Sequence, residues 1–303
     1  MNPQPTLERV WITYLVAVCA TGVLVRDDGS DGQVGMHLAL HAILFAAVLA
    51  VRWVAVHRSH ASARAGRTVL ALFGLPAVFS AMAWLLPRVH PEPWEYVWLQ
   101  WDRAVFGSDL AVLADRWLGP LCVDVLQIVY TSFYFIPIAA VISALRGRGW
   151  AAFDRALLIV VAGFLASYLG YVLVPTLSPA LVLAHAAEPQ GLSVTPFLRH
   201  VIDAGEANPH NCFPSGHTML TIVSLIVAWR WNRRWCWVLL PLVLTLIAST
   251  VLLRYHWATD VVAGALLAWP AVRICDHLAD RDGWPAAEPV PARSVTPGSV
   301  TLG

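Results

Sequence analysis

The feature that most constrains this chain is a series of apolar stretches, each close to the length of a helix that crosses a bilayer. A transmembrane helix needs about 20 largely apolar residues. Eight stretches approach this length: roughly residues 10–25, 36–56, 68–86, 122–145, 153–174, 213–229, 235–253 and 256–272. Hydrophobic residues make up 58% of the 303 residues and charged residues only 13%, so the polar surface of a soluble protein is lacking. The chain is predicted to be an all-α polytopic membrane protein with about eight transmembrane helices.

The charged residues exclude several classes of function. The net charge is +1, and the basic residues are spread singly along the chain instead of forming the dense patch that nucleic-acid binding requires. Every basic residue other than histidine is arginine, so Schiff-base chemistry on a lysine is excluded as well. The cysteines lie far apart, without the spacing typical of zinc sites, and are interpreted as inert thiols: Cys19, Cys122, Cys212, Cys236 and Cys275.

The arginines predict how the chain is oriented in the membrane, because short cytoplasmic loops retain positive charge. Three connections carry them: Arg58, Arg64 and Arg67; Arg146, Arg148 and Arg155; and Arg230, Arg233 and Arg234. These connections follow the second, fourth and sixth predicted helices, so all three lie on one side. That side is predicted to be the cytoplasm, with both termini there and the protein in the plasma (inner) membrane. The run from Val10 to Val25 is expected to be an uncleaved anchor, since no convincing cleavage site follows it.

The opposite, outer side receives two long segments, from Pro87 to Pro120 and from Pro175 to Cys212. The first contains four aromatic residues that are expected to form an interfacial belt at headgroup level: Trp94, Tyr96, Trp98 and Trp101.

One group of functional candidates precedes the sixth predicted helix, in the order Asn211-Cys212-Phe213-Pro214-Ser215-Gly216-His217. Pro214 suits a first helical turn, Ser215 adds a hydroxyl beside unpaired amides, and Gly216 lets the backbone approach a ligand closely. Together they predict an anion site at a helix N-terminus.

A second group, His256-Trp257-Ala258-Thr259-Asp260, opens the last predicted helix. A spacing of four residues places His256 and Asp260 on one helical face, where the carboxylate can hold one ring nitrogen and leave the other free as a nucleophile. An aspartate one turn into a membrane helix is costly unless it is paired or hydrated, which favours a function. Because the predicted topology places both groups on the outer side, they can form one site for phosphoryl transfer.

These motifs resemble those of the type 2 phosphatidic acid phosphatase superfamily, whose second signature is Pro-Ser-Gly-His and whose third ends in His-x-x-x-Asp. The second matches at residues 214–217, and the third ends at His256 and Asp260, with Ser249 at its opening serine. The resemblance implies that His256 attacks phosphorus, Asp260 orients it, and His217 protonates the departing oxygen. No metal and no cofactor are required.

The resemblance also predicts the organisation of the chain. Two extra helices in an N-terminal membrane segment (1–67) precede a six-helix catalytic core (68–275). The remaining residues, 276–303, are rich in Pro, Ala, Ser, Thr and Gly and are expected to form a disordered cytoplasmic tail.

The sequence departs from the superfamily pattern where that pattern supplies positive charge. The first signature, a lysine followed by Arg-Pro, is absent from residues 171–179, and Thr250 replaces an expected arginine. This degeneracy, with Trp101-Asp102-Arg103, Phe106-Gly107 and the stretch 130–134, resembles the inositol phosphorylceramide synthase (aureobasidin-resistance) branch. Arg254, then Arg199 and His210, are the candidates to neutralise phosphate, beside Ser215 and Gly216. Arg254 is equally compatible with contact to lipid headgroups.

Several functions stay open at this point. The predicted partners are a lipid phosphate substrate and membrane lipids, and an alcohol acceptor in the case of a transferase; oligomeric state is left open. Hydrolysis needs only water, which favours a phosphatase over a phosphotransferase to an inositol-like or sugar alcohol. A transporter needs ionisable residues through the membrane, and a silent scaffold has no need of His217, His256 and Asp260. Vanadium haloperoxidases use a related site but are soluble.

Two further pairs of residues have alternative interpretations. His37 and His41, four residues apart, suit a metal, but no third ligand is evident, so the metal interpretation is the weaker one. Tyr130 and Tyr134 are expected to share one helical face and to pack in the core, with a substrate contact implied only by the resemblance.

Overall fold

The computed structural model describes residues 5–25, 31–89, 94–113, 118–183, 189–205 and 209–285. These residues form helices and connecting loops, and the isolated bridge among them joins Thr176 to Asn211. The helices are α1 (Thr6–Leu24), α2 (Asp31–His57), α3 (His60–Val69), α4 (Leu75–Val89), α5 (Glu95–Phe106), α6 (Leu110–Leu113), α7 (Pro120–Thr131), α8 (Ile136–Leu173), α9 (Pro179–Val182), α10 (Val194–Gly205), α11 (Gly216–Trp231), α12 (Arg233–Leu252) and α13 (Ala258–Arg281).

A helix covers each of the eight predicted apolar stretches, which confirms the all-α polytopic fold. Six helical segments of the described chain are long and apolar enough to cross a membrane: Thr6–Leu24, Gly32–His57, His60–Val89, Pro120–Leu173, Arg233–Leu252 and Ala258–Arg281. The segment Pro120–Leu173 holds two predicted stretches, because α8 turns back at Arg148 and Gly149, where Gly149 has a positive φ of 74°. The remaining stretch is α11, which has only 16 residues.

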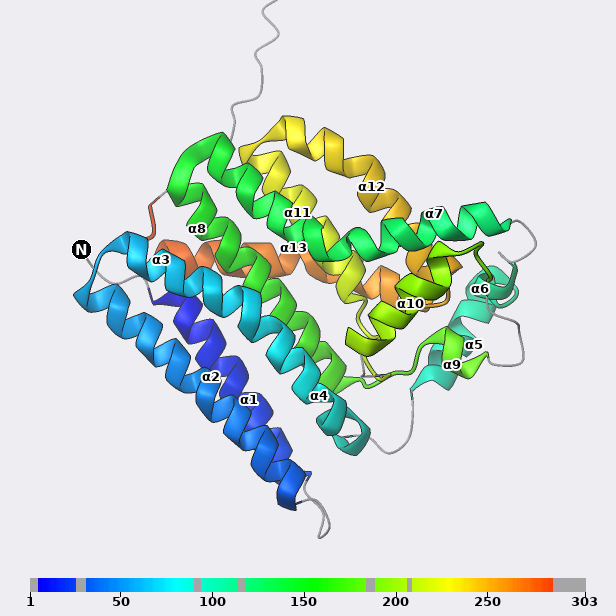
Figure 1. Ribbon diagram of the computed structural model, residues 1–303, viewed down its shortest axis with the longest axis horizontal. Coiled ribbons are helices and arrows are strands. Elements are labelled where there is room, and N and C mark those ends of the chain that lie inside the picture. The colour runs from blue at the N-terminus through cyan, green and yellow to red at the C-terminus, as the bar shows by residue number, and fades with distance from the viewer. Residues whose placement is uncertain are drawn as a thin grey trace, which may run out of the picture.

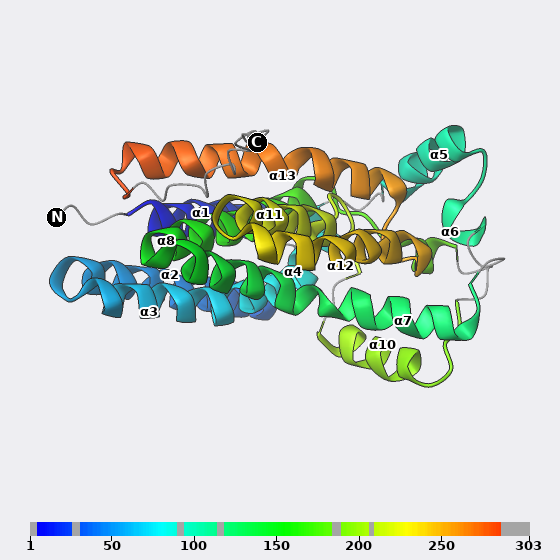
Figure 2. The same ribbon diagram turned by 90° about the horizontal axis from the view of Figure 1, so that it is seen from above.

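The helices form an elongated bundle with its short elements gathered at one end. Helices α1, α2 and α3–α4 run side by side along one flank (Figure 1). Helices α5, α6 and α10, with the start of α7, lie at one end of the long axis. The N-terminus and the C-terminal end of α13 lie at the other (Figure 2).

The three arginine-bearing connections meet at the end of the bundle that holds the N-terminus. Ion pairs join their helices to one another and to α1 and α13: Arg64–Asp154 (2.6 Å), Arg67–Glu8 (2.8 Å), Arg155–Asp280 (2.5 Å), Arg230–Asp276 (2.7 Å) and Arg9–Asp282 (2.9 Å). The arginines that follow alternate helices therefore lie at one common end of the molecule.

The chain is ordered beyond residue 276, where the disordered tail was predicted to begin. Helix α13 continues to Arg281, and Trp284 beyond it is buried. The prediction of disorder from residue 276 is wrong because Asp276, Asp280 and Asp282 bind arginines of α11, α8 and α1. Residues 286–303 lie outside the described part of the chain.

The two N-terminal helices share their packing with the rest of the molecule. Leu7, Trp11 and Tyr14 of α1 belong to the same buried cluster as Phe153 and Leu220 of α8 and α11. The boundary predicted at residue 67 falls inside α3, which passes through a π-helical turn at 70–74 into α4 as one segment. One hydrophobic core thus extends from α1 to α13 and supports the opposite end of the bundle.

Candidate active site

The two predicted motif groups meet at the end of the bundle opposite the ion pairs. His217 Nδ1 and His256 Nε2 lie 3.2 Å apart, within hydrogen-bonding distance. His256 Nδ1 lies 3.6 Å from Asp260 Oδ2. All three side chains are buried, with 8%, 3% and 0% of their surface exposed. Histidine, histidine and carboxylate therefore form one continuous buried row.

The first turn of α11 places His217. Ser215 precedes the helix, and its Oγ accepts a hydrogen bond from Thr218 N at 3.2 Å, as an N-cap does. Gly216 is required here because a Cβ at this position would lie 2.3 Å from the Tyr171 hydroxyl. The space beside Gly216 is thus filled by Tyr171 of α8, and only its backbone is left for a ligand.

The start of α13 places His256 and Asp260. Asp260 Oδ2 accepts a hydrogen bond from Trp257 N at 2.9 Å. This bond holds the carboxylate beside the backbone of Trp257, the residue that follows His256. The two helix starts are also joined directly, because Ser215 N donates to Asp260 O at 3.0 Å. Gly264 permits this close approach, since its Cβ would lie 2.5 Å from Ser215 O.

Asp102, which sequence analysis did not identify as a site residue, caps the N-terminus of α13. Asp102 of α5 accepts from Ala258 N (2.8 Å), Thr259 N (3.1 Å) and Thr259 Oγ1 (2.7 Å). These are free amides at a helix N-terminus, where negative charge is also favoured. Asp102 thereby fixes the loop that carries His256. The sequence offered only a weak signal, an acidic residue within an aromatic stretch.

The segment 174–180, where the first signature is missing, connects the two motif loops. Thr176 N donates to His210 O and Cys212 N donates to Thr176 O, at 3.4 and 3.3 Å. On the other side, Ala180 N donates to Arg254 O at 3.1 Å. The segment keeps a structural position in the site although it contributes no positive charge.

Trp98 does not belong to the aromatic belt predicted for residues 94–101. Trp94, Tyr96 and Trp101 are exposed as expected. Trp98 is instead buried: its ring stacks on Phe213 with centroids 4.8 Å apart, and its Nε1 donates to Thr176 Oγ1 at 3.2 Å. One turn of α5 therefore packs against the loop that precedes His217.

Tyr130 lies against the site, whereas Tyr134 does not share its face. The Tyr130 ring stacks on both His217 (4.6 Å) and Tyr255 (3.9 Å), and the Tyr255 hydroxyl donates to Gln127 Oε1 at 3.1 Å. Tyr134 is exposed. A shared face was expected from helical periodicity, but residues 132–135 form a 3₁₀ turn that changes this periodicity.

Arg254 is buried in the protein instead of extending to the bilayer surface. Only 1% of its surface is exposed, which excludes the lipid-headgroup interpretation. Its φ of +68° is uncommon for a residue with a side chain, and residues held in this way concentrate at functional sites. Among the three candidates for phosphate binding, Arg254 is the nearest in sequence to His256 and the most buried.

Arg199 and His210 lie in different surroundings. Arg199 is partly buried on α10, which packs against α7. His210 lies in the loop before the first motif; burial lowers its pKa below the ordinary value, while the carboxylate of Glu95 acts in the opposite direction. A histidine with a lowered pKa is neutral at pH 7 and therefore a weaker counter-charge for phosphate than an arginine.

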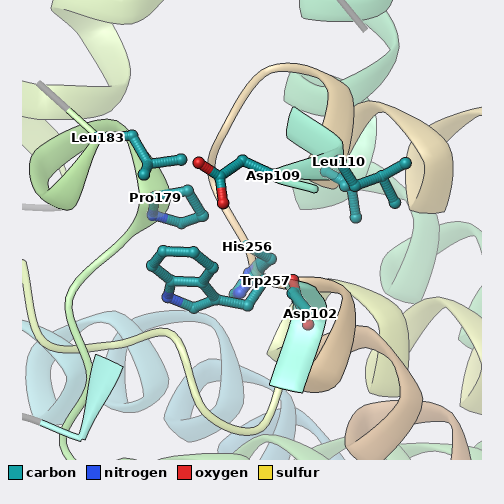
Figure 3. A pocket seen from close by; sticks show the side chains of 8 residues that line it. Asp102, Asp109, Leu110, Pro179, Leu183, His256 and Trp257 are labelled. Carbon is teal, nitrogen blue, oxygen red and sulfur yellow. The ribbon is translucent and has the colours of Figure 1, made fainter. Parts of the chain in front are cut away.

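A cavity reaches His256 from the side of α5 and α6. Asp102, Asp109 and Leu110 line one wall, and Pro179, Leu183 and Trp257 line another (Figure 3). Asp109 forms an ion pair with Arg103. The wall beside the proposed nucleophile is thus made of apolar side chains and paired carboxylates.

The structure brings a thiol to the site, although sequence spacing gave no sign of it. Cys212, His256 and Asp260 each offer one ligand atom, and these atoms lie within 4.8 Å of one another. Cys212, which was interpreted as an inert thiol, therefore lies beside two residues of the site. His37 and His41 do lie ring to ring, 4.2 Å between centroids, but no third His, Cys, Asp or Glu ligand joins them among the described residues.

Comparison with known proteins gave one match. A family model described as the PAP2 superfamily matches residues 97–274, which is more than half of the chain and includes both motif groups. No curated protein and no solved structure gave a match.

Proposed function

Because the chain belongs to the PAP2 superfamily, whose members are generally phosphatases or phosphotransferases, we propose that it is a membrane lipid phosphate phosphatase acting through a phosphohistidine. The observation that carries this proposal is the buried row of His217, His256 and Asp260, with one nitrogen of His256 facing Asp260 and the other facing His217. A histidine with a carboxylate beside one ring nitrogen, and with the lone pair on the other, is a suitable nucleophile.

The roles of the three residues follow from this arrangement. The Asp260 carboxylate lies 3.6 Å from Nδ1 of His256 and favours the ring proton on that nitrogen through its negative charge, so that the Nε2 lone pair attacks phosphorus. The P–N bond forms as the P–O bond to the lipid alcohol breaks, and His217 gives its proton to the departing oxygen. Water then cleaves the P–N bond. Since the two rings are in contact at 3.2 Å, the phosphoryl group enters by separating them.

In this proposal the phosphate charge is neutralised mainly by Arg254, which lies two residues before His256 of the third signature. Arg254 is buried beside the catalytic loop, and the amide of Gly216 lies at the N-terminus of α11, where anions are favoured. Ser215 caps the helix, Arg199 adds positive charge from the outer loop, and the neutral His210 contributes a ring N–H as a hydrogen-bond donor. Arg254 takes the place of the basic residues missing from residues 171–179.

The proposal is tested by measuring phosphate release from a panel of lipid phosphates by purified protein in detergent. Wild type is compared with His256→Ala, with and without added inositol-like or sugar alcohols. Release that disappears in the variant supports the histidine nucleophile. Appearance of a phosphorylated alcohol would instead assign a phosphotransferase, in keeping with the resemblance to inositol phosphorylceramide synthase. Release that persists in the variant would refute the mechanism.

We further propose that the site lies at the extracytoplasmic face and that both termini are cytoplasmic. The support is the common position of the arginine connections at the opposite end of the bundle, together with the cytoplasmic preference of such loops. Cys122, exposed at the start of α7, is a native reporter of the site end. A membrane-impermeant maleimide should label it in intact cells, with Cys122→Ser as the control. Ser59→Cys should be labelled only after permeabilisation; the reverse pattern would invert the topology.

A further inference from the structure

The thiol of Cys212 lies beside the proposed nucleophile. Cys212, His256 and Asp260 are each at least nine-tenths buried, and their ligand atoms lie within 4.8 Å of one another. Among the residues that the structure describes, they are the only such group of three potential metal ligands. Sulfur, imidazole nitrogen and carboxylate oxygen are the three donor types that Zn²⁺ accepts in proteins.

Two of these donor groups have atoms without a hydrogen-bond partner in the described part of the chain: His256 Nδ1 and Asp260 Oδ1. The separation of 3.6 Å between His256 Nδ1 and Asp260 Oδ2 is too long for a hydrogen bond. It is close to the separation of about 3.3 Å expected for two ligands that each lie about 2.0 Å from a tetrahedral ion. The pair is spaced for an ion between its members.

We propose that Cys212, His256 and Asp260 form an inhibitory site for Zn²⁺, an inference that rests on the proposed function of His256. The charges suit a buried site, because a Cys212 thiolate and the Asp260 carboxylate together balance the two positive charges of the ion. Solvent completes the coordination. The thiol hydrogen, which now points to Tyr255 O at 3.4 Å, leaves when the metal binds.

Zinc at this position blocks catalysis through the tautomer of His256. In the proposed reaction Nδ1 carries the proton and Nε2 has the lone pair that attacks phosphorus. Zinc takes the Nδ1 lone pair, so the ring proton moves to Nε2, and that nitrogen can no longer attack. Because the metal lies on the Asp260 side of the ring and phosphate enters on the His217 side, zinc lowers kcat and leaves KM nearly unchanged.

The test measures zinc inhibition of phosphate release by wild type and by Cys212→Ser, each relative to its own activity in chelator. Serine retains a hydrogen for Tyr255 O but is a poor zinc ligand. The zinc concentration for half inhibition should rise at least about tenfold in Cys212→Ser, as expected when a metal site loses part of its coordination. Cys236→Ser, which removes a buried thiol on α12, is the matched control and should behave as wild type.

A second measurement does not depend on enzymatic activity. Co²⁺ added to the purified protein should give a thiolate-to-cobalt charge-transfer band that is absent in Cys212→Ser and is removed by zinc. This band would report the site even if no lipid phosphate were hydrolysed. Equal zinc inhibition of wild type and Cys212→Ser, or a cobalt band that persists without Cys212, would overturn the proposal.

Discussion

At the scale of single residues, the site depends on buried polar groups that have few ways to be satisfied. Asp260 is fully buried, and the hydrogen bond that its side chain accepts comes from Trp257 N. Its second oxygen has no partner among the described residues. A carboxylate in such a position is costly unless it faces a positive charge. In the proposed mechanism that charge forms on His256 as the imidazole reacts, so Asp260 stabilises the reacting state more than the resting one.

Replacing Asp260 by asparagine should lower kcat by about 10²- to 10⁴-fold, because an amide can still accept from Trp257 N but cannot stabilise a positive imidazole. Steady-state kinetics on the best lipid phosphate, with thermal unfolding to show that the fold is retained, measures the effect. A kcat within about twofold of wild type would remove Asp260 from the mechanism.

His210 should make stability depend on pH. Since burial lowers its folded pKa, the unfolded chain binds more protons as pH falls below about 6.5, and stability decreases in that direction. Thermal midpoints of wild type and His210→Gln, compared at about pH 5 and about pH 7.5, test this. The variant should lose less stability on acidification. An identical loss in both proteins would show that His210 does not contribute.

At the scale of elements, the site is held by contacts between helix ends. Asp102 of α5 binds the first amides of α13, and Asp124 of α7 binds Thr195 N and Oγ1 at the start of α10. Both use the same physical principle, an acidic side chain from one helix satisfying free amides at the N-terminus of another. Helix α5 is thereby fixed to the start of α13 beside His256, and α10 is fixed to α7.

Asp102→Ala should lower stability by about 1–2 kcal/mol, the cost of losing a helix cap, and should lower kcat about 10- to 100-fold with little change in KM. Ser59→Ala removes a cap of α3, where Ser59 Oγ accepts from Ser62 N. Ser59 lies at the other end of the bundle, so this control should lose stability without the loss in kcat. Parallel losses of kcat in both variants would indicate that Asp102 acts through global stability alone.

Local patterns in the sequence predicted the helices and singled out His217, His256 and Asp260, which the structure brings together. They succeed because apolar length and a spacing of four residues are properties of a single segment. The role of Asp102 was not recognised, since its partners lie 156 and 157 residues away in the sequence. The contact of Tyr130 with His217 and the position of Cys212 beside Asp260 likewise depend on how distant segments pack. The prediction for Tyr134 assumed a continuous α-helix, and the 3₁₀ turn at 132–135 interrupts that helix.

At the scale of the whole molecule, the bundle has two chemically different ends joined by one apolar core. One end holds the row of His217, His256 and Asp260, and the other holds a group of ion pairs between α1, α3, α8, α11 and α13. The pairs differ in burial. The side chains of Arg67 and Glu8 are 8% and 1% exposed, whereas that of Arg9 is 63% exposed.

Arg67→Ala should therefore destabilise the protein by about 3–5 kcal/mol, because it leaves the Glu8 carboxylate buried without its partner. Arg9→Ala breaks the exposed pair with Asp282 and should cost no more than about 1 kcal/mol. Thermal or denaturant unfolding in a single detergent compares the two. Equal costs would show that burial does not determine the contribution of these pairs.

The pairing of the first helix with the end of the last has a consequence for how the protein is made. Thr6 and Arg9 both contact Asp282, across 276 and 273 residues of chain. Helix α1 is synthesised long before α13, so its polar end acquires this partner only after α13 has been made. The bundle therefore closes late, and the surfaces of α1 that pack inward must be shielded by lipid or by the insertion machinery while the intervening helices emerge from the ribosome.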